Sequence, residues 1–456
     1  MRARCNATAG RIVGAIGVAT LALVMAGCSF TGKQSTLDPK GPVAAQQLNL
    51  FYITVWVSLF IFIIVGSIMA VAVWRFRERP TDSTKPLPDQ GHGNPLVEIG
   101  LIGSSIALLV IIAIPTMKAI WDTMELPTDK PFWPTSLLGN WYPGGAPQGS
   151  DKEPLEVTVT GYQWWWAYDY KQFGVVTANE LIIPVGKVVK LNLRSKDVIH
   201  SYWLPKLAGK VDVIPGRANW LWLMADEDTT QSHTLGLYYG QCAEFCGESH
   251  AYMLIRARVV TPDEFAKWID ANKAPVMPPG ADQPWAVAAL ATAGAKDPSS
   301  IITPAQKATV LWTAFTERSK TPANLITSVD RGAKLFFANC VLCHTINGST
   351  AQGTVGPNLS HVAARASIAA GVLDNLKIGT EEIDPARQNE NFYRWVAQNP
   401  ASPDPKLRDI KPGNLMWYNP QLDQGLKVIR ALNLKAGHAL TDQDFHDLAN
   451  FLQSLK

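Results

Sequence analysis

Two long apolar segments near the N-terminus constrain the fold of this chain more than any other feature. The first runs from about Phe51 to Trp74 and the second from about Leu96 to Ile120. Each provides the roughly 20 apolar residues that a helix needs to cross a bilayer. We therefore predict a two-helix transmembrane hairpin within residues 28–124. The alternative, a pair of buried core helices, fits the length and the flanking charges poorly.

The loop between these two segments is basic, with Arg75, Arg77, Arg79 and Lys85. Short basic loops stay on the cytoplasmic side of a membrane. The N-terminus and everything after about residue 121 are therefore predicted to lie on the outer face.

Residues 1–27 have the features of an export signal. Three arginines precede an apolar run that ends in small residues, as in secretory signal peptides. Ala26-Gly27 directly before Cys28 resembles a bacterial lipobox, which predicts cleavage before Cys28 and a lipid on its thiol. The protein is then expected in a bacterial cytoplasmic membrane. An uncleaved membrane anchor is the alternative.

The rest of the chain is long enough for further domains with cores of their own. Its formal net charge of +3 gives no sign of nucleic-acid binding. The six cysteines fall into three separate contexts, which argues against a general disulfide framework. They are Cys5 and Cys28, Cys242 and Cys246, and Cys340 and Cys343.

Residues 125–272 contain several short stretches that alternate apolar and polar positions, at 155–160, 181–193, 218–224 and 254–260. Short alternating stretches separated by turn residues predict an all-β sandwich or barrel. After the last of them, Thr261-Pro262 opens a helix, and Glu264 completes a capping box.

Residues 273–325 hold a proline-rich stretch, predicted to be a stiff linker, and then an insert that we predict to be partly helical. Residues 326–456 are predicted to form an all-α domain. Its first helix runs into Cys340, and its last helix begins at Thr441 and carries apolar residues at helical spacing.

Cys340-Val341-Leu342-Cys343-His344 has the form C-x-x-C-H. In an exported chain this is the attachment signal of c-type haem. Cys340 and Cys343 would bond covalently to the haem, and His344 would bind the iron from one side. A redox C-x-x-C that happens to precede a histidine is the alternative, and the predicted export argues against it.

The second axial ligand of such a haem is less constrained by the sequence. A thioether suits an electron carrier, and Met416 is the only methionine after Cys343. We therefore predict Met416. Ligation by a second histidine, from His361, His438 or His446, is the alternative.

Residues 241–253 combine two thiols, an imidazole and a thioether in Cys242, Cys246, His250 and Met253. Thiolate and thioether ligands select copper, and imidazole also suits it. An earlier histidine, His200, enlarges the set beyond the His₂Cys ligands of a single electron-transfer copper. The set fits two coppers bridged by both sulfurs. A zinc site, which would leave Met253 unexplained, and a Cys242–Cys246 disulfide are the alternatives.

With these motifs in place, the chain resembles subunit II of the haem–copper cytochrome c oxidases, of the kind fused to a C-terminal cytochrome c domain. The stretches that carry the resemblance are GYQWWW (161–166), DVIHSYW (197–203), KVDVIPGR (210–217) and YGQCAEFCGESHAYM (239–253). The resemblance covers about residues 45–265, and the cytochrome portion about 326–456. The chain departs from the family in the insert at 286–326, and where Trp417-Tyr418 follows Met416 in place of the common proline.

The resemblance implies a cupredoxin-like sandwich with a binuclear CuA centre. The positions that match its ligands are Cys242 and Cys246 as bridges, His200 and His250 on one copper each, and Met253 and the backbone carbonyl of Glu244 as further ligands. The Glu244 side chain would also reach a magnesium ion at the border with subunit I.

The resemblance also implies roles for Trp164 and Glu98. Trp164 matches the position where electrons enter, and Glu98 matches a proton-uptake carboxylate at the cytoplasmic start of the second span. An ordinary core aromatic and a carboxylate that stabilises a helix start are the respective alternatives.

As a whole, the resemblance implies the electron-input subunit of a proton-pumping cytochrome c oxidase. An external donor, such as a cytochrome c or a quinol-oxidising complex, would reduce haem c. Electrons would then pass to CuA and on to subunit I for reduction of oxygen to water, with subunit III as a further partner. A CuA-containing subunit of a nitric-oxide reductase and a membrane-anchored copper-binding lipoprotein are the alternatives. A quinol oxidase subunit and a nitrous-oxide reductase fit less well.

Overall fold

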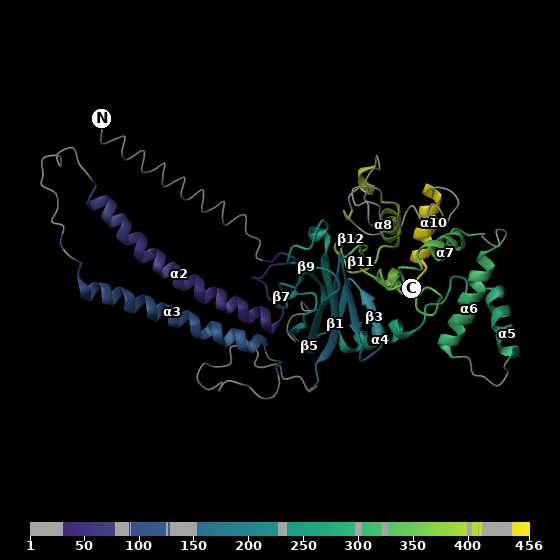
Figure 1. Ribbon diagram of the computed structural model, residues 1–456, viewed down its shortest axis with the longest axis horizontal. Coiled ribbons are helices and arrows are strands. Elements are labelled where there is room, and N and C mark those ends of the chain that lie inside the picture. The colour runs from purple at the N-terminus through teal and green to yellow at the C-terminus, as the bar shows by residue number, and fades with distance from the viewer. Residues whose placement is uncertain are drawn as a thin grey trace.

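The computed structural model describes residues 31–77, 91, 93–124, 126–127, 153–226, 235–296, 303–321, 327–398, 404–408, 410–412 and 440–456. A helical pair, a β-sandwich and a helical domain follow one another along the long axis of the molecule (Figure 1). The predicted signal peptide, Cys28, Met416 and His438 lie outside the described residues.

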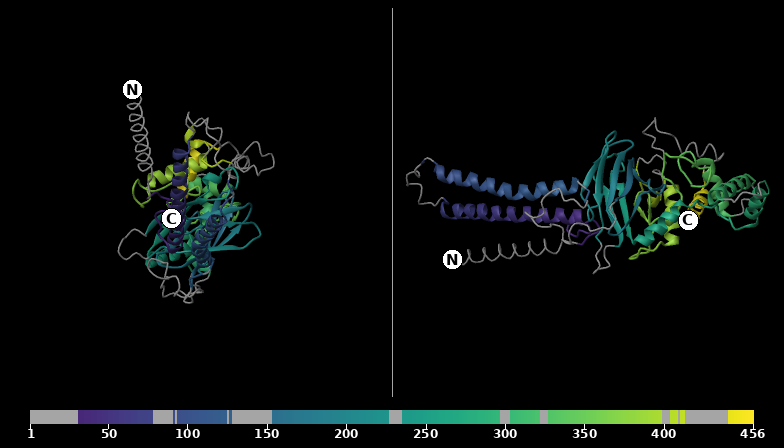
Figure 2. Two further views of the ribbon diagram at one scale, coloured as in Figure 1. Left: turned by 90° about the vertical axis from the view of Figure 1, so that its left-hand side faces the viewer. Right: turned by 90° about the horizontal axis from the view of Figure 1, so that it is seen from below.

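The two predicted spans are the helices α2 (Pro42–Arg75) and α3 (Pro95–Met124). Both are long and apolar enough to cross a membrane, and their most apolar windows are not buried against the rest of the chain. They lie side by side and extend away from the sandwich (Figure 2). Their length and exposed apolar faces suit membrane anchoring, and the predicted hairpin is confirmed as a fold.

Polar contacts hold the pair together at the end nearest the sandwich. The side chains of Gln46 and Lys118 both donate to the carboxylate of Asp122, each at 2.5 Å. Just before α2, the Lys40 amide donates to the carbonyl of Lys206 at 2.7 Å. Side-chain contacts therefore join the two helices at their base, and a backbone hydrogen bond fixes the segment before α2 to the sandwich.

Ten strands form two five-stranded sheets, in the orders β3-β2-β1-β5-β8 and β4-β10-β9-β6-β7. The strands are β1 (Leu155–Tyr162), β2 (Trp165–Tyr170), β3 (Val175–Ala178), β4 (Glu180–Pro184), β5 (Val189–Ser195), β6 (His200–Trp203), β7 (Lys210–Val213), β8 (Asn219–Leu223), β9 (Gly236–Cys242) and β10 (Leu254–Val260). The predicted sandwich is confirmed: three of the alternating stretches coincide with one strand each, and 181–193 contains most of β4 and β5.

The sandwich core follows from the alternation in the sequence. Every second residue of β1 and β2 is buried, which places Trp166, Tyr168 and Tyr170 between the sheets. Buried phenols need hydrogen-bond partners. The Tyr170 hydroxyl donates to the carbonyl of Ile182 at 2.9 Å and accepts from its amide at 2.8 Å. This pair of bonds joins the two sheets.

Helices follow the sandwich. They are α4 (Pro262–Lys273), α5 (Pro284–Lys296), α6 (Pro304–Ser319), α7 (Ser328–Asn339), α8 (Pro385–Ala397) and α10 (Asp442–Gln453), with the 3₁₀ turns η2 (His250–Tyr252), η4 (Val362–Ala364) and η5 (Pro405–Leu407) and a ribbon of β11 (Ser367–Ile368) and β12 (Leu373–Asp374). The predicted capping box at Thr261 is confirmed, and Thr441 caps α10 as predicted.

The core of the helical domain includes part of the predicted linker and insert. Trp312 and Phe315 of α6 pack in one cluster with Phe336 of α7 and Phe451 of α10. The Trp312 indole donates to the carbonyl of Val276 at 2.6 Å. Apolar residues of α6 therefore contribute to the same core as the helices that flank the C-x-x-C-H motif.

A buried carboxylate joins α7 to α10. The Asp447 side chain is 2% exposed and accepts from the Arg331 guanidinium at 2.6 and 2.9 Å, from Gln443 at 2.9 Å, and from the Ser328 hydroxyl. Burial alone would raise the pKa of Asp447, but these donors hold that pKa below its ordinary value. The carboxylate therefore stabilises the domain at neutral pH, and this contribution is lost as the pH falls through the folded-state pKa.

We expect Asp447→Asn to lower the free energy of unfolding of the helical domain by about 2 kcal/mol, because charge-assisted hydrogen bonds are lost while the volume is kept. Guanidinium unfolding of the full chain, followed by the visible circular dichroism of the haem, measures this. Glu317→Gln, which removes an exposed pair with Lys320, should change the same quantity by less than about 0.5 kcal/mol. Equal effects of the two variants would contradict the prediction.

Candidate metal and haem sites

Two neighbouring strands hold the ends of the loop that carries most of the predicted copper ligands. β9 ends at Cys242 and β10 begins at Leu254, and the two strands pair antiparallel. The Cys242 amide donates to the carbonyl of Met253 at 2.9 Å. The pairing of β9 with β10 therefore ends at Cys242 and Met253, the first and last predicted ligands of the loop. The residues between these two lie outside the strands.

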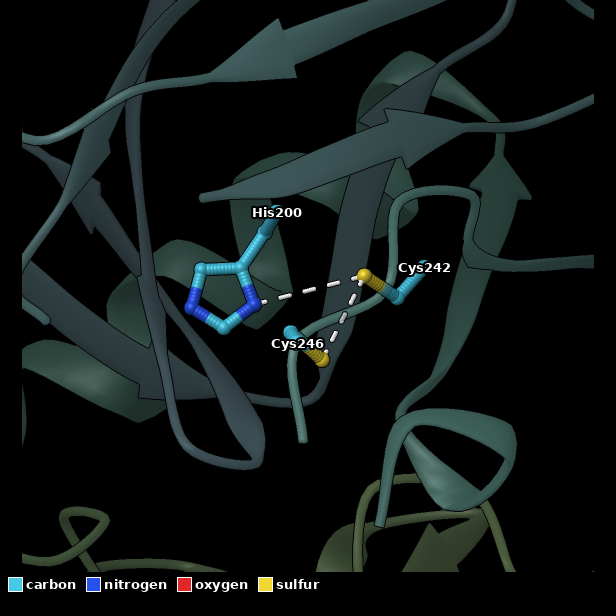
Figure 3. Close-up of side chains that lie close together, drawn as sticks. All are labelled: His200, Cys242 and Cys246. Atoms are coloured by element: carbon cyan, nitrogen blue, oxygen red, sulfur yellow. Dashed lines mark hydrogen bonds between the residues drawn. The ribbon is translucent and has the colours of Figure 1, made fainter. Parts of the chain in front are cut away.

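His200, Cys242 and Cys246 meet at the start of this loop (Figure 3). The two sulfur atoms lie 3.8 Å apart, and the Cys242 sulfur lies 4.0 Å from Nδ1 of His200. All three side chains are buried. His200 comes from β6, which pairs with β9, so a strand pairing brings a residue distant in sequence to the loop.

The other predicted copper ligands surround the same sulfurs. The Cys246 sulfur lies 3.6 Å from Nδ1 of His250 and 3.9 Å from the Met253 sulfur. The Glu244 carbonyl accepts from the Cys242 thiol at 3.2 Å. The structure thus brings together every residue that the sequence offered as a copper ligand.

The pKa values of the two thiols indicate that the site needs positive charge. The hydrogen bond between Cys242 and Cys246 holds the pKa of Cys242 below its ordinary value, and the hydrogen bond with His200 adds to this. The same pairing, together with burial, raises the pKa of Cys246. For both sulfurs to be thiolates, positive charge must lie beside them, and metal cations supply it.

The distances and the burial at this site argue against a Cys242–Cys246 disulfide and favour copper. The sulfurs are free and lie well beyond the bond length of about 2 Å in a disulfide. The thioether of Met253 is completely buried next to Cys246, and thioethers are ligands for soft metals such as copper. Two thiols, two imidazoles and a thioether in a buried pocket fit a pair of copper ions.

Asp197 fixes the orientation of His200. Its carboxylate lies 2.9 Å from Nε2 of His200 and also accepts from the amides of Gln163 and Val198. A carboxylate on one ring nitrogen sets the tautomer and leaves the other nitrogen for a metal. Here that nitrogen is Nδ1, which faces Cys242. This role of Asp197 was not predicted from the sequence, although an acidic residue three positions before a candidate ligand is a usable signal.

A glycine makes room for the same histidine. A side chain at Gly161 would place its Cβ 2.9 Å from the His200 ring and 3.1 Å from Trp166. Such contacts are too close for any residue with a Cβ. Gly161 therefore permits the imidazole to lie flat against β1.

The two residues with predicted transfer roles lie in different parts of the molecule. Trp164 is 8% exposed, and its indole donates to the carbonyl of Cys246 at 2.8 Å, so it contacts the copper loop directly. Glu98 lies in the first turn of α3, at the end of the helical pair far from the sandwich (Figure 1). The length of the helical pair therefore lies between Glu98 and the copper loop.

The C-x-x-C-H motif follows directly from α7. His344 is buried, and its Nδ1 lies 2.8 Å from the carbonyl of Pro357. Nδ1 therefore carries the proton, which leaves Nε2 for an iron. Burial also lowers the pKa of His344, which favours the neutral imidazole that binds metals. Cys340 and Cys343 are free thiols, so the residues fit covalent haem.

Close packing supports the haem interpretation. A Cβ at Gly356 would lie 2.6 Å from the His344 ring, and one at Gly353 would lie 2.5 Å from the backbone of Cys343.

Two of the alternative axial histidines make other contacts. His361 contacts the carbonyl of Ala274 at 3.3 Å, and His446 stacks on Tyr393 with ring centroids 4.1 Å apart.

Comparison with known proteins assigns both parts. Residues 174–260 match the family "Cytochrome C oxidase subunit II, periplasmic domain", and residues 329–456 match the family "Cytochrome c". Proteins named cytochrome c oxidase subunit 2 match most of the chain. That of Alkalihalophilus pseudofirmus is 28% identical over 89% of this chain and 91% of its own length, and that of Bacillus sp. PS3 is 28% identical over 96% and 95%. The quinol oxidase subunit 2 of Bacillus spizizenii is 29% identical over 57% of this chain and 73% of its own length.

We expect Asp197→Ala to weaken copper binding by about 10- to 100-fold, because His200 loses the partner that orients it. Competition for copper with a chelator of known affinity, on the full chain, measures this. Asp263→Ala, in the first turn of α4 and exposed, should leave copper affinity unchanged. Unaltered affinity in Asp197→Ala would show that the carboxylate does not orient the ligand.

Proposed function

We propose that this chain, whose soluble parts belong to the families of the cytochrome c oxidase subunit II periplasmic domain and of cytochrome c, is the electron-input subunit of a membrane-bound, proton-pumping cytochrome c oxidase. Relatives that match it along most of their length are named cytochrome c oxidase subunit 2. As a subunit II, it works with subunit I of a haem–copper oxidase.

One observation carries the proposal. A loop between two paired strands gathers two thiols, two imidazoles and a thioether around one buried point. The domain that follows carries free C-x-x-C thiols and a histidine whose Nδ1 is engaged by a carbonyl. A copper site and a haem site on one chain serve electron transfer.

The residues of the chain would hold and orient the copper ions and the haem. Bound copper and haem would each accept and release single electrons. Cys242 and Cys246 would bridge the coppers, with His200, His250, Met253 and the Glu244 carbonyl as the remaining ligands. Cys340, Cys343 and His344 would hold haem c, with Met416 as the second axial ligand. Fixed ligands keep geometry unchanged on reduction, which favours fast transfer.

The direction of transfer and the further partners complete the proposal. An external donor, such as a cytochrome c or a quinol-oxidising complex, delivers electrons on the outer face, and they leave toward subunit I by way of the copper loop. Trp164, whose indole donates to the carbonyl of Cys246, would be the point where electrons enter the copper site. Glu98 is the proton-uptake carboxylate at the cytoplasmic end of α3. Magnesium at the exposed Glu244 carboxylate, contact with subunit III, and lipid on Cys28 belong to the same proposal.

A quinol oxidase subunit fits less well, and a CuA-containing nitric-oxide reductase subunit is the alternative. A quinol oxidase subunit would not need the complete set of soft ligands that this chain gathers, nor the haem motif that follows it. A nitric-oxide reductase subunit with a CuA centre would use the same copper ligands, and it differs in the reaction of its partner subunit.

We expect the full chain, matured with haem and loaded with copper, to bind about two coppers for each haem, because the ligands form one bridged pair. Metal analysis gives the ratio, and electron paramagnetic resonance shows one unpaired electron shared by both coppers. Cys246→Ser should abolish this signal because it removes a bridging ligand. Cys343→Ser should leave the copper content unchanged, since it changes only the haem motif.

Three results would contradict the proposal. They are zinc in place of copper, a single copper with the spectrum of a mononuclear site, and a Cys242–Cys246 disulfide that persists when copper is added under reducing conditions. Oxygen consumption by the complex with its subunit I, in place of nitric-oxide reduction, separates the oxidase from the reductase.

A further inference from the structure

A buried carboxylate and a buried guanidinium lie side by side on the sandwich and face the cytochrome domain. Glu180 begins β4 and is 6% exposed, and Arg256 in β10 is 8% exposed. The two residues are register partners in the parallel pairing of β4 with β10. Charged side chains are almost never buried without partners. The partners of Glu180 and Arg256 therefore identify the part of the chain that this surface binds.

The partners of Glu180 come from one loop of the cytochrome domain. Its carboxylate accepts from the amides of Ala366 and Ser367, at 3.2 and 2.7 Å, and from the Ser367 hydroxyl at 3.1 Å. Arg365 is buried nearby and attracts the carboxylate. Three donors on consecutive residues specify both the position and the direction of the loop.

The partner of Arg256 lies a few residues further along the same loop. Its guanidinium donates to the carbonyl of Gly371 at 2.7 Å and lies over the ring of Tyr239, 4.5 Å from the ring centre. A Cβ at Gly371 would lie 3.0 Å from the guanidinium carbon. Beside this contact, the Leu254 amide donates to the carbonyl of Ala370 at 3.1 Å.

A second segment of the cytochrome domain then lies directly on the copper loop. The Lys411 ammonium donates to the carbonyl of Trp164, and the hydroxyl of Ser249 donates to the carbonyl of Pro412. Lys411 is 6% exposed and Trp164 is 8% exposed. Trp164 therefore contacts the cytochrome domain through its backbone carbonyl, while its indole contacts Cys246 and its side chain packs in the sandwich core.

We infer that Glu180 and Arg256 fix the cytochrome domain in one position on the sandwich, and that this position closes Trp164 to soluble donors. The inference rests on the proposed function for its electron path. A soluble cytochrome c then reduces only the haem of the last domain. One electron passes at each step: the soluble donor is oxidised as haem c is reduced, and haem c is oxidised again as the copper pair is reduced. Glu180 and Arg256 are positioning residues, since they touch neither metal.

The first test measures docking without using any electron transfer. In the full chain with copper and haem, hydrogen–deuterium exchange should be slow in the 365–371 loop. Glu180→Ala and Arg256→Ala should each accelerate exchange there by about tenfold or more, because the amides lose their acceptor or the loop loses its second anchor. Glu156→Ala, which removes a half-buried carboxylate on β1 that accepts from Lys190, is the matched control. Unchanged exchange in both interface variants would overturn the inference.

The second test follows copper reduction after mixing with reduced soluble cytochrome c. In the unaltered chain, the rate should reach a ceiling as the donor concentration rises, because every electron passes through haem c. In Glu180→Ala the ceiling should fall by about tenfold, since small misplacements are costly, and a direct route that rises linearly with donor should appear. Glu180→Gln keeps one acceptor oxygen and should lie between the two.

The outcomes separate this inference from the proposed function. If copper in the unaltered chain is reduced at a rate that rises without a ceiling, Trp164 is open and the inference is wrong, while the proposed function stands. If haem c never reduces copper in the unaltered chain, the proposed electron path is wrong, and the exchange test still decides whether the domain is fixed. Copper content and circular dichroism confirm that each variant folds.

Discussion

The antiparallel pairing of β9 and β10 is the constraint on which the copper site depends. Cys242 ends one strand and Met253 immediately precedes the other, and a backbone hydrogen bond joins them at 2.9 Å. The loop between can therefore turn only toward the pocket where β6 presents His200. Gly247, at a φ of +112°, provides a turn that other residues rarely adopt. Buried thiols 3.8 Å apart follow from this closure.

The local parts of this arrangement could be predicted from the sequence, because they depend on short-range patterns. Alternation predicted the strands, and the capping boxes predicted the helix starts at Thr261 and Thr441. The types of ligand and their spacing predicted which residues meet around the two sulfurs. Apart from the contribution of His200, each of these inferences needs only the chemistry of a few neighbouring residues.

Partners whose contact depends on the conformation of a loop or on the docking of two domains could not be predicted in this way. Asp197 was visible in the sequence, but its bond to His200 depends on how the turn before β6 is folded. The contact of Lys411 with Trp164 depends on how two domains dock, and no periodicity encodes that. The same holds for α6, whose Trp312 packs in the core of the cytochrome domain although its sequence reads as an insert.

Covalent linkage explains why charges occupy the interface between the two domains. Domains joined by a short linker meet at high effective concentration, so their contact needs little affinity of its own. Buried charges add little net affinity but make every displaced arrangement costly, because a shifted partner leaves a charge unpaired. Glu180 and Arg256 bind backbone groups of one loop, and backbone groups cannot adapt by changing rotamer. An interface built this way selects one orientation, and the proposed electron transfer by way of Trp164 would require a single orientation.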